Sequence, residues 1–136
     1  RRTLIRTARG VVFPEAITDA IGVINSAELA VTYGVQIPGE TVAITALTVQ
    51  PGQSVTAADL SEAIADMAAG LPPDIVHVVA ELPLSASYRP TVSALRAEGL
   101  PKPSRNSWYR DADTGEYKRF TAAVRSKMLG TAGSQS

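Results

Sequence analysis

Two runs of β-branched and small apolar residues constrain the fold of this chain more than any other feature of its sequence. The runs cover residues 28–36 and 41–49, and Pro38-Gly39-Glu40 lies between them. β-branched residues favour strands, and a Pro-Gly pair between two such runs favours a tight reversal of the chain. The sequence therefore predicts an antiparallel hairpin in the first half of the chain.

Helical periodicity lies on both sides of this hairpin. Pro14 suits the first turn of a helix, because a helix start leaves that N–H unpaired anyway, and three Ile residues at helical spacing follow it. After the hairpin, Thr56-Ala57-Ala58-Asp59 has the spacing of a capping box, and Gly70 suits the end of the helix that follows. The apolar faces of the two predicted helices are Ile17, Ile21 and Ile24 in the first and Leu60, Ile64, Met67 and Leu71 in the second.

Shorter elements complete the expected order. Residues 4–13 suit two small strands around Gly10, and residues 75–79 are a continuous apolar run, typical of a strand buried on both faces. The remaining expectations are a loop over 82–90, a short helix over 91–98, a hairpin from 107–110 and 116–118, and a helix over 120–129. This order predicts an α+β domain over residues 1–130, with a small mixed or antiparallel sheet flanked by helices, and a disordered tail over 131–136.

Composition excludes several classes of site. The 136 residues are 45% hydrophobic, which suffices for one core, and they include no Cys and one His, which leaves no basis for a thiolate or His-based metal centre. P-loop, dinucleotide, nucleophile-elbow and zinc-protease motifs are missing from the sequence. No apolar run approaches the roughly 20 residues that span a bilayer, and the amino end lacks the apolar core of a signal peptide. We therefore expect a cytoplasmic protein without a transmembrane segment.

The formal net charge of zero conceals two basic ends around an acidic middle. Residues 1–10 carry four Arg and no acid, residues 11–86 carry nine acids and no Lys or Arg, and residues 87–136 carry nine Lys or Arg against four acids. If the fold brings the basic ends together, they form a positive face suited to a phosphorylated ligand or an acidic protein. From charge alone, however, we favour an ordinary solvated surface.

Three local features are candidates for function. A lone His inside a buried strand, as His77 is, is more often a structural residue than a catalyst. Arg89 follows small polar residues in a loop and is placed to reach out of the domain. Near the carboxyl end, aromatic and basic residues mingle, which suits either stacking of single-stranded nucleic acid or a hairpin whose rings pack across its strands. We favour the packed hairpin for these rings, which are Trp108, Tyr109, Tyr117 and Phe120.

Four segments in this order resemble the mobile C-terminal domain of the adenylate-forming enzymes, the superfamily of acyl-CoA synthetases, peptide-synthetase adenylation domains and luciferases. The segment Ile5–Pro14 is similar to the family's hinge-adjacent segment. The segment Val31–Gly39 resembles the Val-x-Gly-Val-x-Val-Pro-Gly strand of the fatty acid transport protein and very-long-chain acyl-CoA synthetase branch. Leu82–Arg89 lies where that branch has Thr-Gly-Thr-Phe-Lys, and Trp108–Tyr117 resembles its Tyr-x-x-Asp hairpin. Within the branch, the resemblance is greatest to the mycobacterial FadD-type fatty acyl-AMP ligases.

The resemblance implies the C-terminal lid of a ligase that uses ATP to convert a fatty acid to acyl-AMP. The lid would complete the adenylation site and then rotate about a hinge near Arg1, so that the acyl group passes to the phosphopantetheine thiol of an acyl carrier protein or of CoA. The N-terminal adenylation domain of the same chain would hold most of the ATP and Mg²⁺. The isolated domain is then expected to be inactive, and nucleic acid is not expected among its partners.

The resemblance also implies roles for particular residues. Arg89 lies at the position of the family's catalytic Lys, with Ser85, Ser87 and Tyr88 supporting its loop. Arg brings a planar fork in place of a compact ammonium, so this exchange is not conservative at a tight site.

A second group of residues lies beside the expected channel for the pantetheine thiol, and it comprises Arg6, Arg9 and Gly10. Here the family's Gly aligns with Arg9. We expect the two departures from the family to favour an acyl carrier protein, whose acidic surface suits the basic ends. The alternative is a stand-alone α+β binding or regulatory module with a basic docking face.

Overall fold

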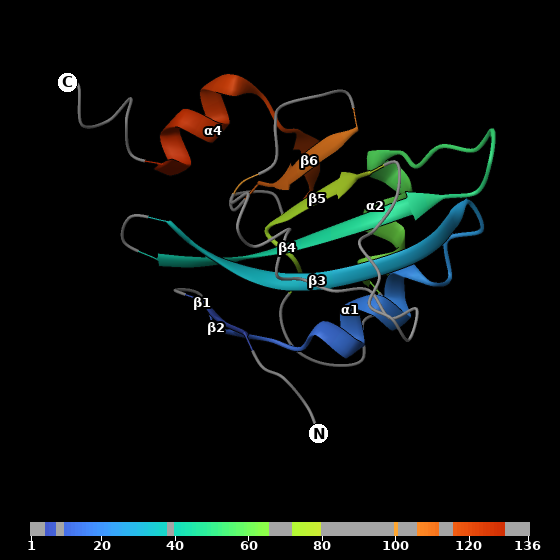
Figure 1. Ribbon diagram of the computed structural model, residues 1–136, viewed down its shortest axis with the longest axis horizontal. Helices are drawn as coiled ribbons and strands as arrows, with labels where there is room; N and C mark the ends of the chain where they lie inside the picture. Colours follow the sequence, from blue (N-terminus) through green and yellow to red (C-terminus); the bar gives the residue numbers. More distant parts are fainter. Residues whose placement is uncertain are drawn as a thin grey trace, which may run out of the picture.

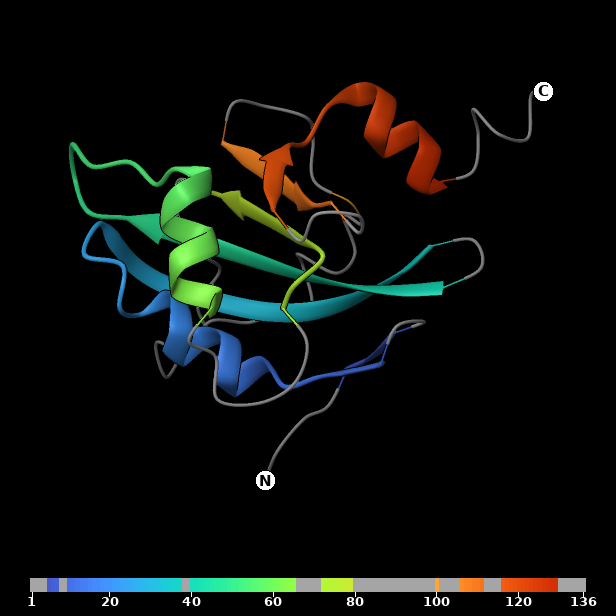
Figure 2. The ribbon, with the colours of Figure 1, turned by 180° about the vertical axis from the view of Figure 1, so that it is seen from behind.

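The computed structural model describes residues 5–7, 10–37, 40–65, 72–79, 100, 106–111 and 116–129. A five-stranded sheet forms its centre, and a two-stranded ribbon and two helices lie against one face of it (Figures 1 and 2). The strands are β1 (Ile5–Thr7), β2 (Gly10–Val12), β3 (Ala27–Ile37), β4 (Glu40–Val49), β5 (Ile75–Val78), β6 (Ser107–Arg110) and β7 (Tyr117–Arg119). The described helices are α1 (Pro14–Ile21), α2 (Ala57–Ala65) and α4 (Ala122–Leu129). The predicted α+β class is confirmed.

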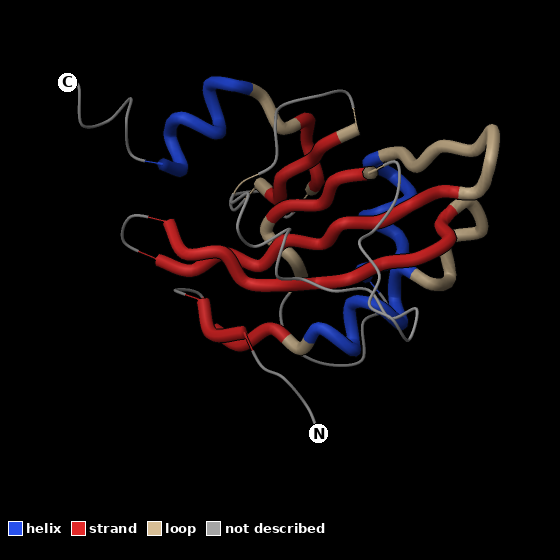
Figure 3. The backbone as a smooth tube through the Cα atoms, viewed as in Figure 1, coloured by secondary structure: helices blue, strands red, loops and turns tan. Residues whose placement is uncertain are grey.

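The large sheet is mixed, with the order β3-β4-β5-β6-β7. Figure 3 shows its strands in red, in the view of Figure 1. The predicted central hairpin is present: β3 and β4 pair antiparallel from Ala27 opposite Val49 to Ile37 opposite Glu40. β4 and β5 pair in parallel, whereas β5–β6 and β6–β7 are antiparallel. The parallel pair requires a crossover connection, and α2 lies in that crossover.

Each face of the sheet has its own buried cluster, because successive side chains of a strand point to opposite faces. On β4, Ala43 and Leu47 belong to the cluster under α1 and α2, whereas Ile44 and Ala46 belong to the cluster on the other face. The first cluster contains Ile5, Val12, Ile17, Ile21, Leu60, Val76 and Trp108. The second contains Tyr33, Val35, Ile37, Val42, Ile75, Leu100 and Phe120. The sheet is therefore buried on both sides, which explains why most residues of its central strands β4 and β5 are apolar.

The helix starts follow the predicted local signals. Pro14 is the first residue of α1. Thr56 and Asp59 form the predicted capping box, in which the Thr56 N–H donates to Asp59 Oδ2 and the Asp59 N–H donates to Thr56 Oγ1, both at 3.1 Å. α4 begins two residues later than expected, after Thr121, because the Thr121 hydroxyl oxygen accepts the N–H of Val124 at 3.3 Å and so caps the helix.

Several predictions of structure lie outside the described residues. They are the continuation of the second helix through Met67 to Leu71, the loop over 82–90, the short helix over 91–98 and the tail over 131–136. Among the described helices, none combines the length and the apolar character that crossing a membrane requires.

Candidate functional site

The ribbon formed by β1 and β2 carries two of the residues expected beside the thiol channel, Arg6 and Gly10. Arg6 pairs with Val11 and is exposed, and Thr7 pairs with Gly10. The Thr7 hydroxyl donates to the carbonyl oxygen of Gly10 at 2.9 Å, which closes the ribbon. Gly10 has φ 147°, a conformation that residues with a Cβ rarely adopt. The structure thus brings Arg6 and Gly10 into one ribbon, while Arg9 lies outside the described residues.

Two apolar side chains hold this ribbon on the body of the domain. Ile5 is 7% exposed and Val12 is fully buried, and the two residues pair with each other across the ribbon. Both belong to the cluster that includes Ile17 and Leu47, from α1 and β4. The ribbon is therefore packed against the sheet, with Arg6 on its outer surface.

His77 and Tyr33 form a buried polar pair on the second face of the sheet. The hydroxyl oxygen of Tyr33 lies 3.2 Å from His77 Nε2, and the two residues are 2% and 9% exposed. Burial lowers the pKa of His77 from its ordinary value of 6.5 to about 4, because the charged imidazolium loses its hydration. His77 is thus neutral at pH 7 and surrounded by core residues, which supports a structural role.

The aromatic residues near the carboxyl end belong to the core. Trp108, Tyr117 and Phe120 are 6%, 4% and 0% exposed. The Tyr117 hydroxyl donates to the carbonyl oxygen of Pro73 at 2.6 Å, which ties β7 to the start of β5. These three rings are therefore unavailable to stack on bases, as the packed-hairpin interpretation predicts.

Basic residues of the same hairpin lie on its solvent-exposed face. Lys118 Nζ and Asp111 Oδ2 form an ion pair of 2.7 Å, and this hydrogen bond raises the pKa of Lys118. Arg119 is exposed on the outermost strand β7. Asp111 thus offsets the charge of Lys118, and Arg119 adds an exposed positive charge on the edge strand.

Sequence reasoning missed the part played by Asp74, which is 8% exposed just before β5. Its Oδ2 accepts the N–H of Ala43 at 2.8 Å, and its own N–H donates to the carbonyl oxygen of Ala43 at 2.8 Å. Its carbonyl oxygen accepts the N–H of Arg110 at 2.9 Å. Asp74 therefore ties together β4, β5 and β6. An acidic residue directly before an apolar strand was the available signal.

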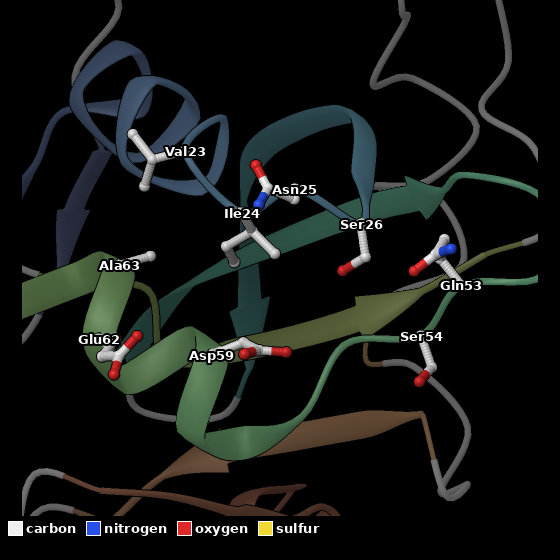
Figure 4. A pocket seen from close by; sticks show the side chains of 9 residues that line it. All are labelled: Val23, Ile24, Asn25, Ser26, Gln53, Ser54, Asp59, Glu62 and Ala63. Atoms are coloured by element: carbon white, nitrogen blue, oxygen red, sulfur yellow. The ribbon is translucent and has the colours of Figure 1, made fainter.

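An open pocket of about 540 Å³ was likewise not predicted. It lies between the segment that follows α1, the loop before α2, and α2 itself, as Figure 4 shows. Its side chains come from Val23, Ile24, Asn25, Ser26, Gln53, Ser54, Asp59, Glu62 and Ala63. The charged side chains in this lining are both acidic, and none of the predicted site residues belongs to it.

The remaining predicted site residues lie outside the described part of the chain. They are Arg89 and its loop neighbours Ser85, Ser87 and Tyr88. Within the described part, no three His, Asp or Glu side chains lie close enough together to hold a metal ion.

Comparison with known proteins identifies the fold. No protein-family profile and no curated protein matches the chain. Among solved structures, ATP-bound MatB from Rhodopseudomonas palustris matches with a TM-score of 0.62 at 18% identity, over 70% of this chain and 19% of that one. A Mycobacterium tuberculosis fatty acyl CoA synthetase matches with a TM-score of 0.61 at 14% identity, over 70% and 19%. The o-succinylbenzoate CoA synthetase (MenE) of Bacillus subtilis matches with a TM-score of 0.58 at 18% identity, over 74% and 20%.

These matches concern one part of much longer enzymes. The chain spans about a fifth of the length of the structures it matches, at their C-terminal end. Identities of 14% to 18% show the fold, and the resemblance in fold extends to several acyl-CoA synthetases. The chain therefore has the fold of the C-terminal domain of adenylate-forming enzymes.

Proposed function

We propose that this chain is the C-terminal lid domain of a fatty acid ligase of the mycobacterial FadD type. The ligase converts a fatty acid and ATP to acyl-AMP and pyrophosphate, and then transfers the acyl group to a phosphopantetheine thiol. The observation that carries this function is the fold shared with the C-terminal fifth of adenylate-forming enzymes. The lid alone is inactive, because the N-terminal adenylation domain holds ATP, Mg²⁺ and the fatty acid.

The packing of the β1–β2 ribbon supports a lid that moves as one body. Ile5 and Val12 bury their side chains against the sheet, so a pivot between ribbon and sheet would expose both of them to water. A pivot near Arg1, before the ribbon, leaves this packing intact. Rotation there carries the ribbon and the sheet together.

Arg89 is the residue that we assign to the adenylation step. A cation at the position of the family's Lys offsets the charge that moves onto pyrophosphate and the α-phosphoryl oxygens as the acyl-adenylate forms. Ser85, Ser87 and Tyr88 support its loop. Arg6, Arg9 and Gly10 then line the path of the thiol in the second step.

We assign an acyl carrier protein rather than CoA as the preferred acceptor. Exposed Arg6 contributes positive charge from the ribbon, beside the proposed path of the thiol. Carrier proteins present an acidic surface, and complementary charge accelerates encounter and selects the partner.

The test uses the longer protein that contains this chain. Pyrophosphate release and product mass are measured with ATP, Mg²⁺ and a panel of fatty acids, with CoA or a phosphopantetheinylated carrier protein as acceptor. We expect acyl-AMP that is transferred to the carrier protein and not to CoA. Formation of acyl-CoA would instead assign an ordinary acyl-CoA synthetase, and no pyrophosphate with any acid would favour a binding module.

A further inference from the structure

Gly34 on β3 lies close to Ile5 of the β1–β2 ribbon. A Cβ atom added to Gly34 would lie 3.2 Å from Ile5 Cγ2, 3.9 Å from Ile5 Cγ1 and 3.4 Å from Thr41 Cγ2. Carbon atoms pack at about 3.5 to 4.0 Å, so the nearest of these contacts is too short for a relaxed methyl group. The absence of a side chain at position 34 therefore lets Ile5 rest on the strand.

The backbone of β3 does not require a glycine at this position. The positive φ angles among the described glycines belong to Gly10 and Gly52, and Gly34 pairs with Ala43 in the regular β3–β4 ladder. Glycine in a strand interior weakens the strand, and it often marks a close approach of another chain segment. The contact with Ile5 is thus the feature of this structure that accounts for glycine here.

We propose that Gly34 is a positioning residue that seats the ribbon and thereby sets how far Arg6 stands from the sheet. Arg6 directly follows Ile5, and successive side chains of a strand point to opposite sides. Lifting Ile5 by a few tenths of an ångström therefore moves Arg6 outward with it. This role depends on the lid function proposed above, in which the ribbon lies beside the path of the thiol.

The contact between Ile5 and Gly34 is tested by amide hydrogen exchange on this chain carrying Gly34→Ala. We expect exchange in β1 and β2 to become faster by about tenfold or more, because the displaced ribbon opens more often, while exchange in β4 and β5 stays unchanged. Gln36→Ala is the matched control, because Gln36 is exposed on the same face of β3 and Ala there adds no Cβ. We expect that control to leave the ribbon unchanged.

A second variant separates the contact from a general loss of stability. Ile5→Ala removes both Ile5 atoms near the new methyl group. In that background, Gly34→Ala should no longer accelerate exchange in the ribbon. Two outcomes would contradict the proposed contact between Gly34 and Ile5. One is that Gly34→Ala leaves hydrogen exchange in the ribbon unchanged in the unmodified chain. The other is that it accelerates exchange equally in both backgrounds.

The consequence for the reaction is tested in the longer protein with Gly34→Ala. We expect pyrophosphate release to stay within about twofold of the parent and transfer to the thiol to fall by about tenfold or more, because misplacement of a binding group by a fraction of an ångström is costly. A loosened ribbon with both steps unaffected would overturn the role of Gly34 in positioning, even if the parent proves to be a ligase. A parent without adenylation activity would instead overturn the lid function, whatever the exchange data show.

Discussion

The hydroxyl group of Tyr33 on β3 reaches Nε2 of His77 on β5, at 3.2 Å, across the strand β4 that separates them. Burial keeps the imidazole neutral at pH 7, with a pKa lowered to about 4. The single His of the chain is therefore coupled to stability through its protonation.

Acidification should weaken the fold through His77. Between pH 6.5 and pH 4 the unfolded chain binds a proton at this ring and the folded chain does not. The contribution of neutral His77 to the free energy of unfolding is therefore present above pH 6.5 and lost as the pH falls. The free energy of unfolding should fall by about 3 kcal/mol near pH 4 through this group. Urea unfolding at pH 7.5 and 4.5 checks this, with His77→Gln as reference. Equal pH dependence in the two proteins would contradict it.

The capping box of α2 should contribute measurably to stability. Thr56→Ala and Asp59→Ala each remove one of the two reciprocal hydrogen bonds, and each should lower the free energy of unfolding by about 1 kcal/mol. The double variant should lose less than the sum of the two, because the bonds support each other. Ser54→Ala, in the exposed loop before the helix, is the control. Fully additive losses would show that the two residues act independently.

Asp74 should be sensitive to the loss of its acceptor oxygen rather than of its charge alone. Asp74→Ala leaves the buried N–H of Ala43 without this partner and should cost about 1 to 3 kcal/mol of unfolding free energy. Asp74→Asn retains an oxygen that can accept the same bond and should cost less. Chemical denaturation of both variants provides the measurement, and a larger loss for Asn than for Ala would refute the assignment.

Tyr117 should lose stability when only its hydroxyl group is removed. Tyr117→Phe breaks the buried hydrogen bond to Pro73 and leaves that carbonyl oxygen without this donor, at a cost of about 1 to 2 kcal/mol. Tyr109→Phe is the matched control, because this ring is half-buried on the neighbouring strand β6. The control should change the free energy of unfolding by less than about 0.5 kcal/mol. Thermal unfolding of the two variants side by side distinguishes these outcomes.

Local chemistry made much of the fold predictable. Pro14 begins α1 and Thr56 caps α2 because both signals act within one turn of chain. The β3–β4 hairpin was equally accessible, since two apolar runs around Pro38-Gly39-Glu40 have few other ways to pair.

Contacts between distant segments were not predictable in the same way. Ile5 meets Gly34, and Asp74 binds Ala43, at separations along the chain for which no local pattern exists. The pocket near Glu62 is formed by three separate segments, so it appears only once α1 and α2 pack together. Of the candidate site, the sequence predicted two small strands with Gly10 between them. The structure has the two strands, with Gly10 as the first residue of β2, and only the structure shows how this ribbon packs.

The parallel pairing of β4 with β5 has a consequence for how the chain assembles. β3 and β4 can pair as soon as both exist, but β5 can join only after the crossover that contains α2 has formed, which makes its addition a slow, non-local step. Until then β4 presents an unpaired edge that carries Ile44 and Leu47, both fully buried in the finished sheet. A fragment that stops before Ile75 would keep the edge of β4 unpaired permanently and should aggregate through it.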